Sequence, residues 1–269
     1  ISEWGDLIGQ GGYFDYKPKW FRILFGTYYL WADLYFRHSA DIVIVLSTFM
    51  KEYAITRGIK NESIVIVPGG AMCDVIPEIE IDKTELKFPD NILTFGYIGI
   101  DNRELQDLLP LINVLQQEKY YDKFRIFVFG KKINNEILIK YNLQDILIEC
   151  GWVNYYEDQH MLQFVDIFLL IKTDSKISSA GWPNKLGDYM AIGRPVMVTP
   201  YGDIKKFISD NPKGFILISP NRESIEDQLD KILDKKYDLV KMGHTNRLIA
   251  EEKISWDSRI RDIISILDK

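Results

Sequence analysis

Cysteine is scarce in this chain of 269 residues, which contains only Cys73 and Cys150. The two cysteines lie far apart, and neither belongs to a C-x-x-C pair or to a cluster with histidine. A disulfide scaffold and a zinc site are therefore not expected, and the default location for such a chain is the reducing cytoplasm. The sequence also has no apolar run near the roughly 20 residues that cross a bilayer, and no signal-peptide pattern.

Two glycine-rich motifs that bind phosphate are absent as well. Gly96 and Gly99 are spaced as G-x-x-G, without the third glycine and the helix start that a dinucleotide-binding fingerprint requires. A Walker loop is also missing. NAD-linked chemistry and P-loop chemistry are therefore disfavoured.

Histidine is nearly as sparse as cysteine. His38, His160 and His244 are scattered, and no Ser/His/Asp or Cys/His arrangement is suggested, so no side chain is assigned a catalytic role. The composition is that of an ordinary globular protein, with 46% hydrophobic and 27% charged residues. The formal net charge of -6 argues against a general affinity for nucleic acid.

What the sequence does contain is an alternation of short β-branched apolar runs with helical segments, which predicts a parallel sheet covered by helices. A first unit places strands at 42–46 and 64–67 around one helix. A second series places strands at 92–98, 124–129, 146–150, 166–171, 195–199 and 214–218. The helices expected in this series are 103–118, 158–165, one opened by Pro183, 203–209, and two or three after residue 222.

The helix from Pro183 to Gly193 is the most informative segment. Proline is tolerated in the first turn of a helix, and glycine ends a helix by taking the left-handed conformation. The free N–H groups and the positive dipole end make an anion site at the helix start, where Lys185 adds a cation. Asp188 lies one turn further along, and its side chain leans back toward the start. A ligand with phosphate and hydroxyl groups would suit this arrangement.

Three predicted strands are each followed by a glycine, namely Gly99, Gly130 and Gly151. Glycine lets a ligand approach the backbone, although these loops could also need it simply to turn. Lys185 and Arg103 are candidate cations for a diphosphate, because charge-assisted contacts to phosphate are short and strong.

The segment 17–37 is dense in aromatic and basic residues. Such a helix can lie on a membrane surface. Its aromatic residues are distributed all round the helix, however, which favours burial, either against the first sheet or against a portion of that domain not present here. Peripheral membrane contact is therefore the less favoured interpretation.

Several runs together resemble family-4 glycosyltransferases. Residues 40–47 (ADIVIVLS) and 64–70 (IVIVPGG) resemble the late part of that family's N-terminal domain and its entry into the hinge. Residues 183–196 (PNKLGDYMAIGRPV) resemble its donor-site block, PxKLxEYMAxGxPV. A strand at 214–218 and a closing Ser255-Trp256 helix follow in the same order. The matches span residues 40–269, nearly the whole chain.

The resemblance implies an α/β chain of the GT-B type, with a Rossmann-like donor domain and a partial N-terminal Rossmann-like domain. It implies the boundaries 1–68 for the partial domain, 69–90 for an interdomain hinge, and 91–252 for the donor domain. Residues 253–269 would then form a helix that packs back toward the N-terminal domain. Only about 68 residues precede the hinge, so the chain is expected to be a fragment or a truncated member that binds nucleotide without transferring sugar on its own.

By similarity, loop glycines approach the nucleotide, the backbone at the helix start holds the phosphates, and the second acid of an E-x7-E motif grips the ribose. Asp188 stands at that second acid, whereas the first acid falls at Ala180. The family's arginine falls at Ile100, so Arg103 would substitute for it. The residues expected to bind the donor nucleotide and its phosphates are Gly99, Arg103, Gly130, Val153, Pro183, Asn184, Lys185, Leu186 and Asp188.

The expected function is transfer of a sugar from a nucleotide-sugar to an acceptor in polysaccharide or glycoconjugate biosynthesis, with the configuration retained and no metal required. The acceptor, whether a sugar, a lipid-linked group or a protein, is not indicated. The alternative is a non-catalytic module that binds nucleotide-sugars, to which the loss of a carboxylate at Ala180 points. A sugar epimerase of the same fold is less favoured, since it would need more carboxylates and histidines.

Overall fold

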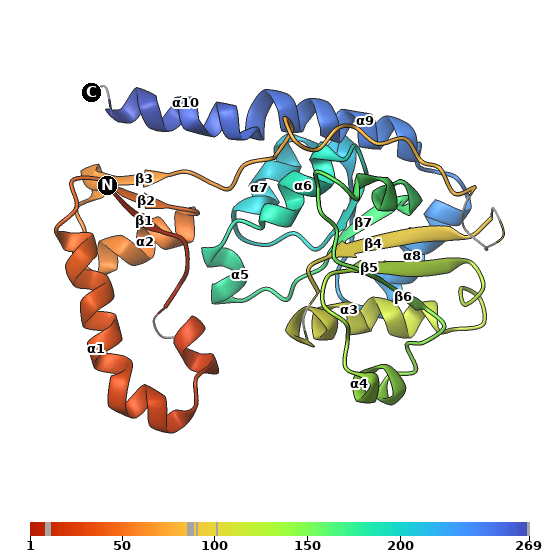
Figure 1. Cartoon of the computed structure of the whole chain (residues 1–269), viewed down its shortest axis with the longest axis horizontal. Coiled ribbons are helices and arrows are strands. Elements are labelled where there is room, and N and C mark those ends of the chain that lie inside the picture. Colours follow the sequence, from red (N-terminus) through yellow and green to blue (C-terminus); the bar gives the residue numbers. More distant parts are fainter. Residues whose placement is uncertain (9–11, 85–88, 90, 101, 268–269) are drawn as a thin grey trace.

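The computed structural model describes residues 1–8, 12–84, 89, 91–100 and 102–267 (Figure 1). Two parallel sheets organise this part of the chain. The first has the order β1-β2-β3 and is formed by β1 (Ser2–Trp4), β2 (Val43–Val45) and β3 (Ile64–Ile66). The second has the order β6-β5-β4-β7-β8-β9. Its strands are β4 (Leu93–Ile98), β5 (Phe124–Phe129), β6 (Leu147–Gly151), β7 (Ile167–Leu170), β8 (Val196–Val198) and β9 (Phe215–Leu217).

The order of the second sheet is that of a doubly wound fold. The chain starts in the middle at β4, moves outward to β6, returns to β7 on the other side of β4, and moves outward again to β9. Such sheets bind ligands at the carboxyl ends of the strands where the order reverses, here between β4 and β7. The predicted α/β fold with Rossmann-like parallel sheets is confirmed.

Helices cover both faces of the second sheet. One face packs on α3 (Asn102–Leu115), α4 (Asn135–Lys140) and α8 (Arg222–Leu233), and the other on α6 (Asn184–Ala191) and α7 (Gly202–Asp210). Because both faces are covered, the strands are apolar without alternation. The remaining helices are α1 (Lys19–His38), α2 (Thr48–Thr56), α5 (Lys176–Ala180), α9 (Leu239–Ile249) and α10 (Trp256–Leu267). Short helical turns are η1 (Tyr13–Tyr16), η2 (Asn61–Ser63), η3 (Gln159–Phe164), η4 (Pro212–Gly214) and η5 (Ala250–Ile254).

The expected strands all form, within one or two residues at each end, but some expected helices differ. The segment 158–165 is the 3₁₀ helix η3, in which Met161 N and Val165 N donate to carbonyls three residues earlier. Its Asp158 N-cap makes no side-chain capping bond, so the first turn lacks the support that an α-helix start normally has. The short elements β1, α4 and α5 were not predicted, because three to six residues are too few for a clear periodicity.

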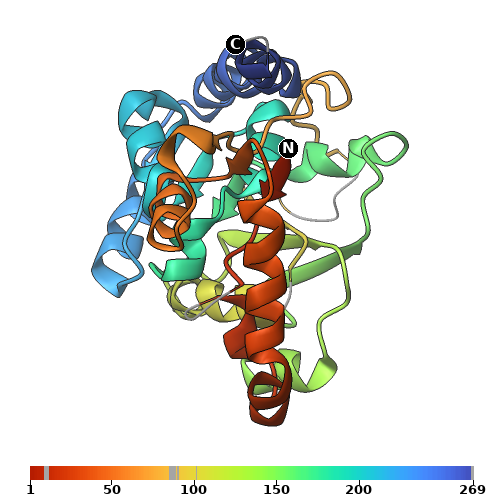
Figure 2. The ribbon, with the colours of Figure 1, turned by 90° about the vertical axis from the view of Figure 1, so that its left-hand side faces the viewer.

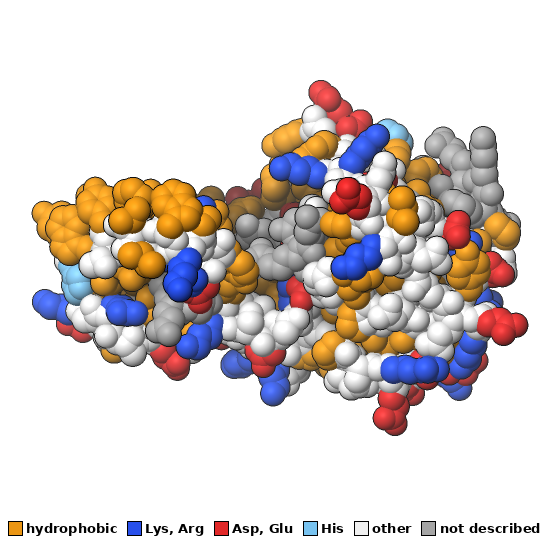
Figure 3. All heavy atoms as spheres, turned by 90° about the horizontal axis from the view of Figure 1, so that it is seen from below, with side chains coloured by type: hydrophobic (Ala, Val, Ile, Leu, Met, Phe, Trp, Pro, Cys, Tyr) orange, Lys and Arg blue, Asp and Glu red, His pale blue; other side chains and the backbone are white. Residues whose placement is uncertain are grey.

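The aromatic helix α1 is not buried, so packing of its rings against the first sheet, one of the two expected partners, was wrong, while packing against a further portion of the domain stays a prediction. Trp20, Tyr28 and Trp31 are 60%, 63% and 59% exposed, and Gly26 is its one buried residue among those described. Figure 3 shows hydrophobic side chains gathered at this end of the molecule, and α1 runs along the outer side of the first unit (Figure 1 and Figure 2). The helix carries more rings than η1 and a three-stranded sheet can cover. No helix in the described ranges is long and apolar enough to cross a membrane.

The segment that joins the two sheets is held by hydrogen bonds to the second unit, which consists of the second sheet and the helices that follow its strands. Ala71 N donates to Ile254 O at 2.6 Å, and Trp256 N donates to Ala71 O at 3.1 Å. Arg247 adds hydrogen bonds to Ala191 O and Cys73 O, and Ile76 is completely buried. From this junction α10 extends in the direction of the three-stranded sheet (Figure 1). The proposed boundaries after residues 68, 90 and 252, and the packing of 253–269 on the first unit, stay predictions.

Candidate functional site

The carboxyl ends of the central strands form a glycine-lined edge. Gly99 and Gly130 follow β4 and β5, Gly151 is the last residue of β6, and each has a positive φ, of 69°, 130° and 76°. A Cβ atom on Gly130 would lie 3.3 Å from the Cα atom of Gly99, so these two loops pack backbone to backbone. A Cβ atom on Gly151 would meet nothing within 4 Å. The sheet therefore presents bare backbone where a doubly wound fold binds ligands.

Helix α6 is fixed with its start beside this edge. Pro183 is its N-cap, and Gly193, with φ of 79°, follows its C-cap, as the sequence predicted. The ring of Tyr189 stacks on Phe168 of β7 at a centroid distance of 4.2 Å. Its hydroxyl accepts a hydrogen bond from Ile98 N at 3.1 Å. One tyrosine thus ties the helix to both strands at which the sheet order reverses.

Lys185 reaches from the first turn of α6 to the end of β4. Its Nζ donates to Gly99 O at 3.0 Å, to the Tyr97 hydroxyl at 3.3 Å and to Glu104 Oε1. The ammonium also lies 4.4 Å from the centroid of the Tyr97 ring. Tyr97 is completely buried, and burial raises the pKa of its phenol, so it stays neutral beside the lysine. Two predicted residues, Gly99 and Lys185, are therefore in contact.

A second lysine, which the sequence analysis missed, lies nearby. Lys172 follows β7, and its Nζ is 3.1 Å from Glu104 Oε1 and 3.8 Å from Asp107 Oδ2. Glu104 and Asp107 both come from α3, so this helix supplies carboxylates to two lysines from different elements. The available signal was position alone, since Lys172 directly follows a buried strand at the edge where ligands bind.

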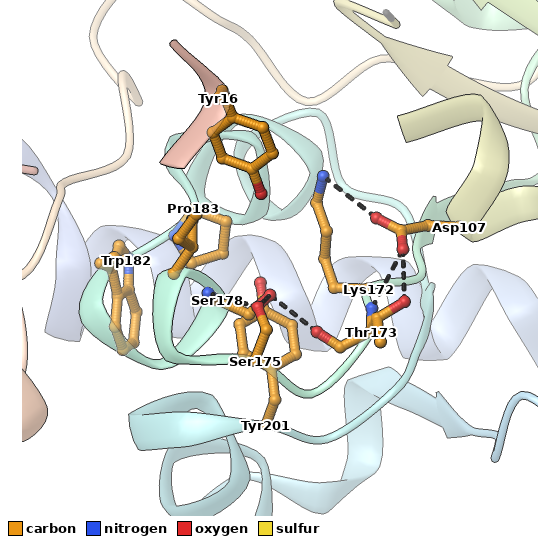
Figure 4. A pocket seen from close by; sticks show the side chains of 11 residues that line it. Tyr16, Asp107, Lys172, Thr173, Ser175, Ser178, Trp182, Pro183 and Tyr201 are labelled. Atoms are coloured by element: carbon orange, nitrogen blue, oxygen red, sulfur yellow. Dashed lines mark hydrogen bonds and ion pairs between the residues drawn. The ribbon is translucent and has the colours of Figure 1, made fainter. Parts of the chain in front are cut away.

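A cavity of about 400 Å³ opens beside Lys172 and the start of α6 (Figure 4). Figure 4 shows Lys172 directed at Asp107, while the Ser175 and Ser178 hydroxyls and the Tyr201 ring line the wall. The cavity is closed on one side by Tyr16 of the first unit. Its lining residues are Tyr16, Asp107, Lys172, Thr173, Ser175, Ile177, Ser178, Gly181, Trp182, Pro183 and Tyr201. Hydroxyl donors and acceptors, one ammonium and a helix start are groups that suit a sugar phosphate.

Asp188 lies deeper than a surface carboxylate. Burial raises its pKa to about 6, and the Tyr155 hydroxyl donates to Asp188 Oδ2 at 3.1 Å, which partly offsets that rise. The pKa of Tyr155 is itself raised, chiefly by burial. The carboxylate is thus oriented by one phenol from the loop after β6, the same loop that contains Val153.

The sequence model of the family "Glycosyl transferases group 1" matches residues 89–235, more than half of the chain. The chain belongs to this family. A comparison with curated protein sequences found no match.

Solved structures of glycosyltransferases share the fold of this group 1 chain. Sucrose-phosphate synthase from Thermosynechococcus elongatus is 14% identical with a TM-score of 0.67, covering 95% of this chain and 64% of its own. A glycosyltransferase from Rickettsia africae is 16% identical with a TM-score of 0.62, covering 93% of this chain and 66% of its own. HepE from Anabaena, solved with UDP-glucose, is 14% identical with a TM-score of 0.67, covering 89% and 67%. The chain thus spans less than two thirds of the first of these proteins.

The other residues predicted for the donor site of this glycosyltransferase-family chain lie in different surroundings. Leu186 is completely buried, so only its backbone could meet a ligand, and its N–H donates to Pro183 O at 3.0 Å. Asn184 is exposed, and its side chain lies against Gly69, where a Cβ atom would be 2.3 Å from Asn184 Oδ1. Val153 is half-buried and packs against the hydrophobic core on the side of the second sheet that α6 and α7 cover. Arg103 belongs to the first turn of α3, and its side chain lies outside the described residues.

Ala180, where the resemblance places the first acid, joins the two units of the group 1 chain. It is 2% exposed, and its carbonyl accepts a hydrogen bond of 2.7 Å from the Ser47 hydroxyl. The same Ser47 oxygen accepts from Met50 N at 3.1 Å and caps α2. A nearby second contact runs from Thr48 N to Asp203 Oδ2 at 2.7 Å. The start of α2 is therefore anchored on the second unit.

Replacing Ser47 by alanine should lower the free energy of unfolding by about 1–3 kcal/mol, because it leaves a buried carbonyl and a buried N–H without partners. Denaturant unfolding followed by circular dichroism measures the change. Ser39→Ala is the matched control, since the exposed Ser39 hydroxyl bonds only to Phe36 O among the contacts described. An equal loss in both variants would contradict an anchoring role for Ser47.

Proposed function

We propose that this chain binds a nucleotide-sugar donor at the carboxyl edge of the second sheet, with the diphosphate between Gly99 and the start of α6. The observation that carries the proposal is the convergence of Lys185, Lys172 and the Gly99 backbone where the strand order reverses. The helix start adds N–H groups and a favourable dipole for an anion. Asp188, one turn into α6, would accept hydrogen bonds from the ribose.

The reaction we propose is glycosyl transfer. The bond between the sugar C1 atom and the β-phosphate oxygen breaks, and an acceptor hydroxyl oxygen forms the new bond to C1. The acceptor proton goes to an oxygen of the leaving diphosphate, whose charge Lys185 stabilises. Attack from the face that the diphosphate leaves would retain the configuration, as the family-4 resemblance implies. That the reaction needs no metal also stays part of the proposal.

The proposed donor carries a uracil nucleotide. HepE was solved with UDP and with UDP-glucose, and it shares the fold of this chain. The cavity beside Lys172, with its serine and threonine hydroxyls, would take the sugar or the incoming acceptor. We place the activity in polysaccharide or glycoconjugate biosynthesis in the cytoplasm. The acceptor stays open between a sugar, a lipid-linked group and a protein.

A second candidate function is nucleotide-sugar binding without transfer. It is favoured by Ala180, which puts a buried methyl group and a carbonyl bonded to Ser47 where the resemblance places an acid. A carboxylate at this position would contact the donor sugar, so its loss removes one group that could orient C1. The two functions share the donor site and differ in turnover.

Calorimetry with UDP, GDP and ADP tests the shared premise. We expect a dissociation constant for UDP in the micromolar to millimolar range, with GDP and ADP weaker. Release of free glucose or galactose from the corresponding UDP-sugar, followed by chromatography, then separates the two functions. Binding with slow hydrolysis supports a transferase, and binding without any hydrolysis supports the binding module. If none of the three nucleotides binds, the donor-site assignment is wrong.

A further inference from the structure

One carboxylate holds both lysines of the candidate phosphate site. Glu104 Oε1 is 3.1 Å from Lys172 Nζ and is in direct contact with Lys185 Nζ. Lys172 follows β7, Lys185 belongs to α6, and Glu104 belongs to α3. The carboxylate therefore links three elements that are separate in the sequence. The ammonium of Lys185 is at the same time bonded to Gly99 O, at the place proposed for the diphosphate.

The three side chains are well shielded from solvent. Glu104, Lys172 and Lys185 are 12%, 17% and 22% exposed, whereas pairs on the outer surface, such as Lys206 with Asp210, are 81% and 57% exposed. Exposed ion pairs contribute little, but shielded charges interact more strongly, and removing one partner is costly. Two shielded lysines side by side therefore need a counter-ion while no anionic ligand is present.

We propose that Glu104 is an exchangeable counter-ion that the donor diphosphate displaces from Lys185 and Lys172, and that recaptures both lysines when the nucleoside diphosphate leaves. This inference rests on the proposed function, because it assigns the diphosphate to these lysines. Glu104 is then a positioning residue that weakens the binding of the product nucleotide. In exchange, it keeps the lysines extended toward the site between turnovers.

An acidic side chain in the first turn of a helix is commonly a purely structural feature, since it suits the helix dipole. The two roles predict opposite changes in ligand binding. If Glu104 serves only the helix, its loss weakens the site that α3 helps to support. If Glu104 competes with the diphosphate, its loss strengthens binding even though the ligand-free protein becomes less stable.

The test is Glu104→Gln, which keeps the size of the side chain and removes its charge. We expect UDP to bind about threefold to tenfold more tightly than to the wild-type chain, while the melting temperature of the ligand-free protein falls. Glu136→Gln is the matched control: Glu136 is exposed on α4, and its substitution changes the net charge by the same amount. Affinity should be unchanged in this control, measured by calorimetry in the same buffer.

A double-mutant cycle with Lys185→Met completes the experiment. The gain from Glu104→Gln should shrink in the Lys185→Met background, because the carboxylate can then release only the Lys172 ammonium. Unchanged or weaker UDP binding by Glu104→Gln, or a gain of the same size with and without Lys185, would overturn the exchange. Failure of the proposed function gives a different pattern, in which no nucleotide binds to the wild-type chain or to either variant.

Discussion

Replacing Lys185 by methionine should weaken binding of UDP by about 10- to 100-fold. Hydrogen bonds that involve a charged group contribute about 1.5–3 kcal/mol each, and 1.4 kcal/mol corresponds to a factor of ten in affinity. Methionine preserves the unbranched apolar stem, so the packing of the side chain over the Tyr97 ring is largely kept while the ammonium is lost. Calorimetric titration of the variant with UDP gives the ratio of dissociation constants.

The control for this substitution is Lys213→Met, which removes the same charge from an exposed position next to β9. The comparison separates a local contact from a change in the overall field of the protein. Lys185→Arg should recover part of the affinity, because the charge returns but the larger head does not fit the contact with Gly99 O in the same way. Equal affinities for the wild-type chain and Lys185→Met would show that the diphosphate lies elsewhere.

The helix start and the strand ends could be predicted from the sequence because their signals are local. Pro183 and Gly193 mark the limits of α6 by their backbone chemistry, and the structure places both as expected. Gly99, Gly130 and Gly151 follow apolar runs, and each takes the positive φ for which glycine is suited. The contact of Lys185 with Gly99 followed from the doubly wound order, which brings the ends of β4 and β7 together.

The partners of these residues could not be predicted, because they depend on tertiary packing. Glu104 reaches Lys172 and Lys185 only because α3 and α6 both start at the same edge of the sheet. Tyr155 finds Asp188 across 33 positions of the chain through the path of one loop. Nothing in the spacing of these residues specifies such contacts.

In helix α1 a local signal favoured burial, and the structure rules out the first sheet as the surface that covers its rings. Aromatic residues all round a helix usually mean burial. Here the unit beside α1 has three short strands, so the rings stack on one another, as Trp31 does on Tyr35 at 5.4 Å, and stay exposed. The composition indicates that the aromatic rings of α1 could be buried. Only the structure shows that the neighbouring three-stranded sheet is too small to cover them.

Binding of UDP-glucose should weaken about tenfold between pH 8 and pH 5, because Asp188 must be ionised to accept hydrogen bonds from the ribose hydroxyls. Burial raises the pKa of Asp188 to about 6, so about one molecule in eleven carries the carboxylate at pH 5. The phosphates of UDP-glucose do not titrate in this range, unlike the terminal phosphate of UDP. The measurement is a calorimetric titration at each pH, and a flat profile would contradict the role given to Asp188.

Asp188→Asn should abolish this pH dependence and bind UDP-glucose about tenfold or more weakly at pH 8, while the ligand-free chain becomes more stable. The pKa of Asp188 is raised in the folded state, so the folded protein binds the proton more tightly than the unfolded chain. Its ionisation therefore costs stability as the pH rises through about 6, and that cost is absent at low pH.

The free energy of unfolding of Asp188→Asn at pH 8 should exceed that of the wild-type chain by about 1–3 kcal/mol. Asparagine still accepts the Tyr155 hydrogen bond, and a pKa shift of about two units corresponds to about 3 kcal/mol. Asp122→Asn, an exposed control, should change neither property. Weaker binding together with higher stability is the combination expected of a carboxylate kept for a ligand, because a carboxylate kept for the fold would lose both.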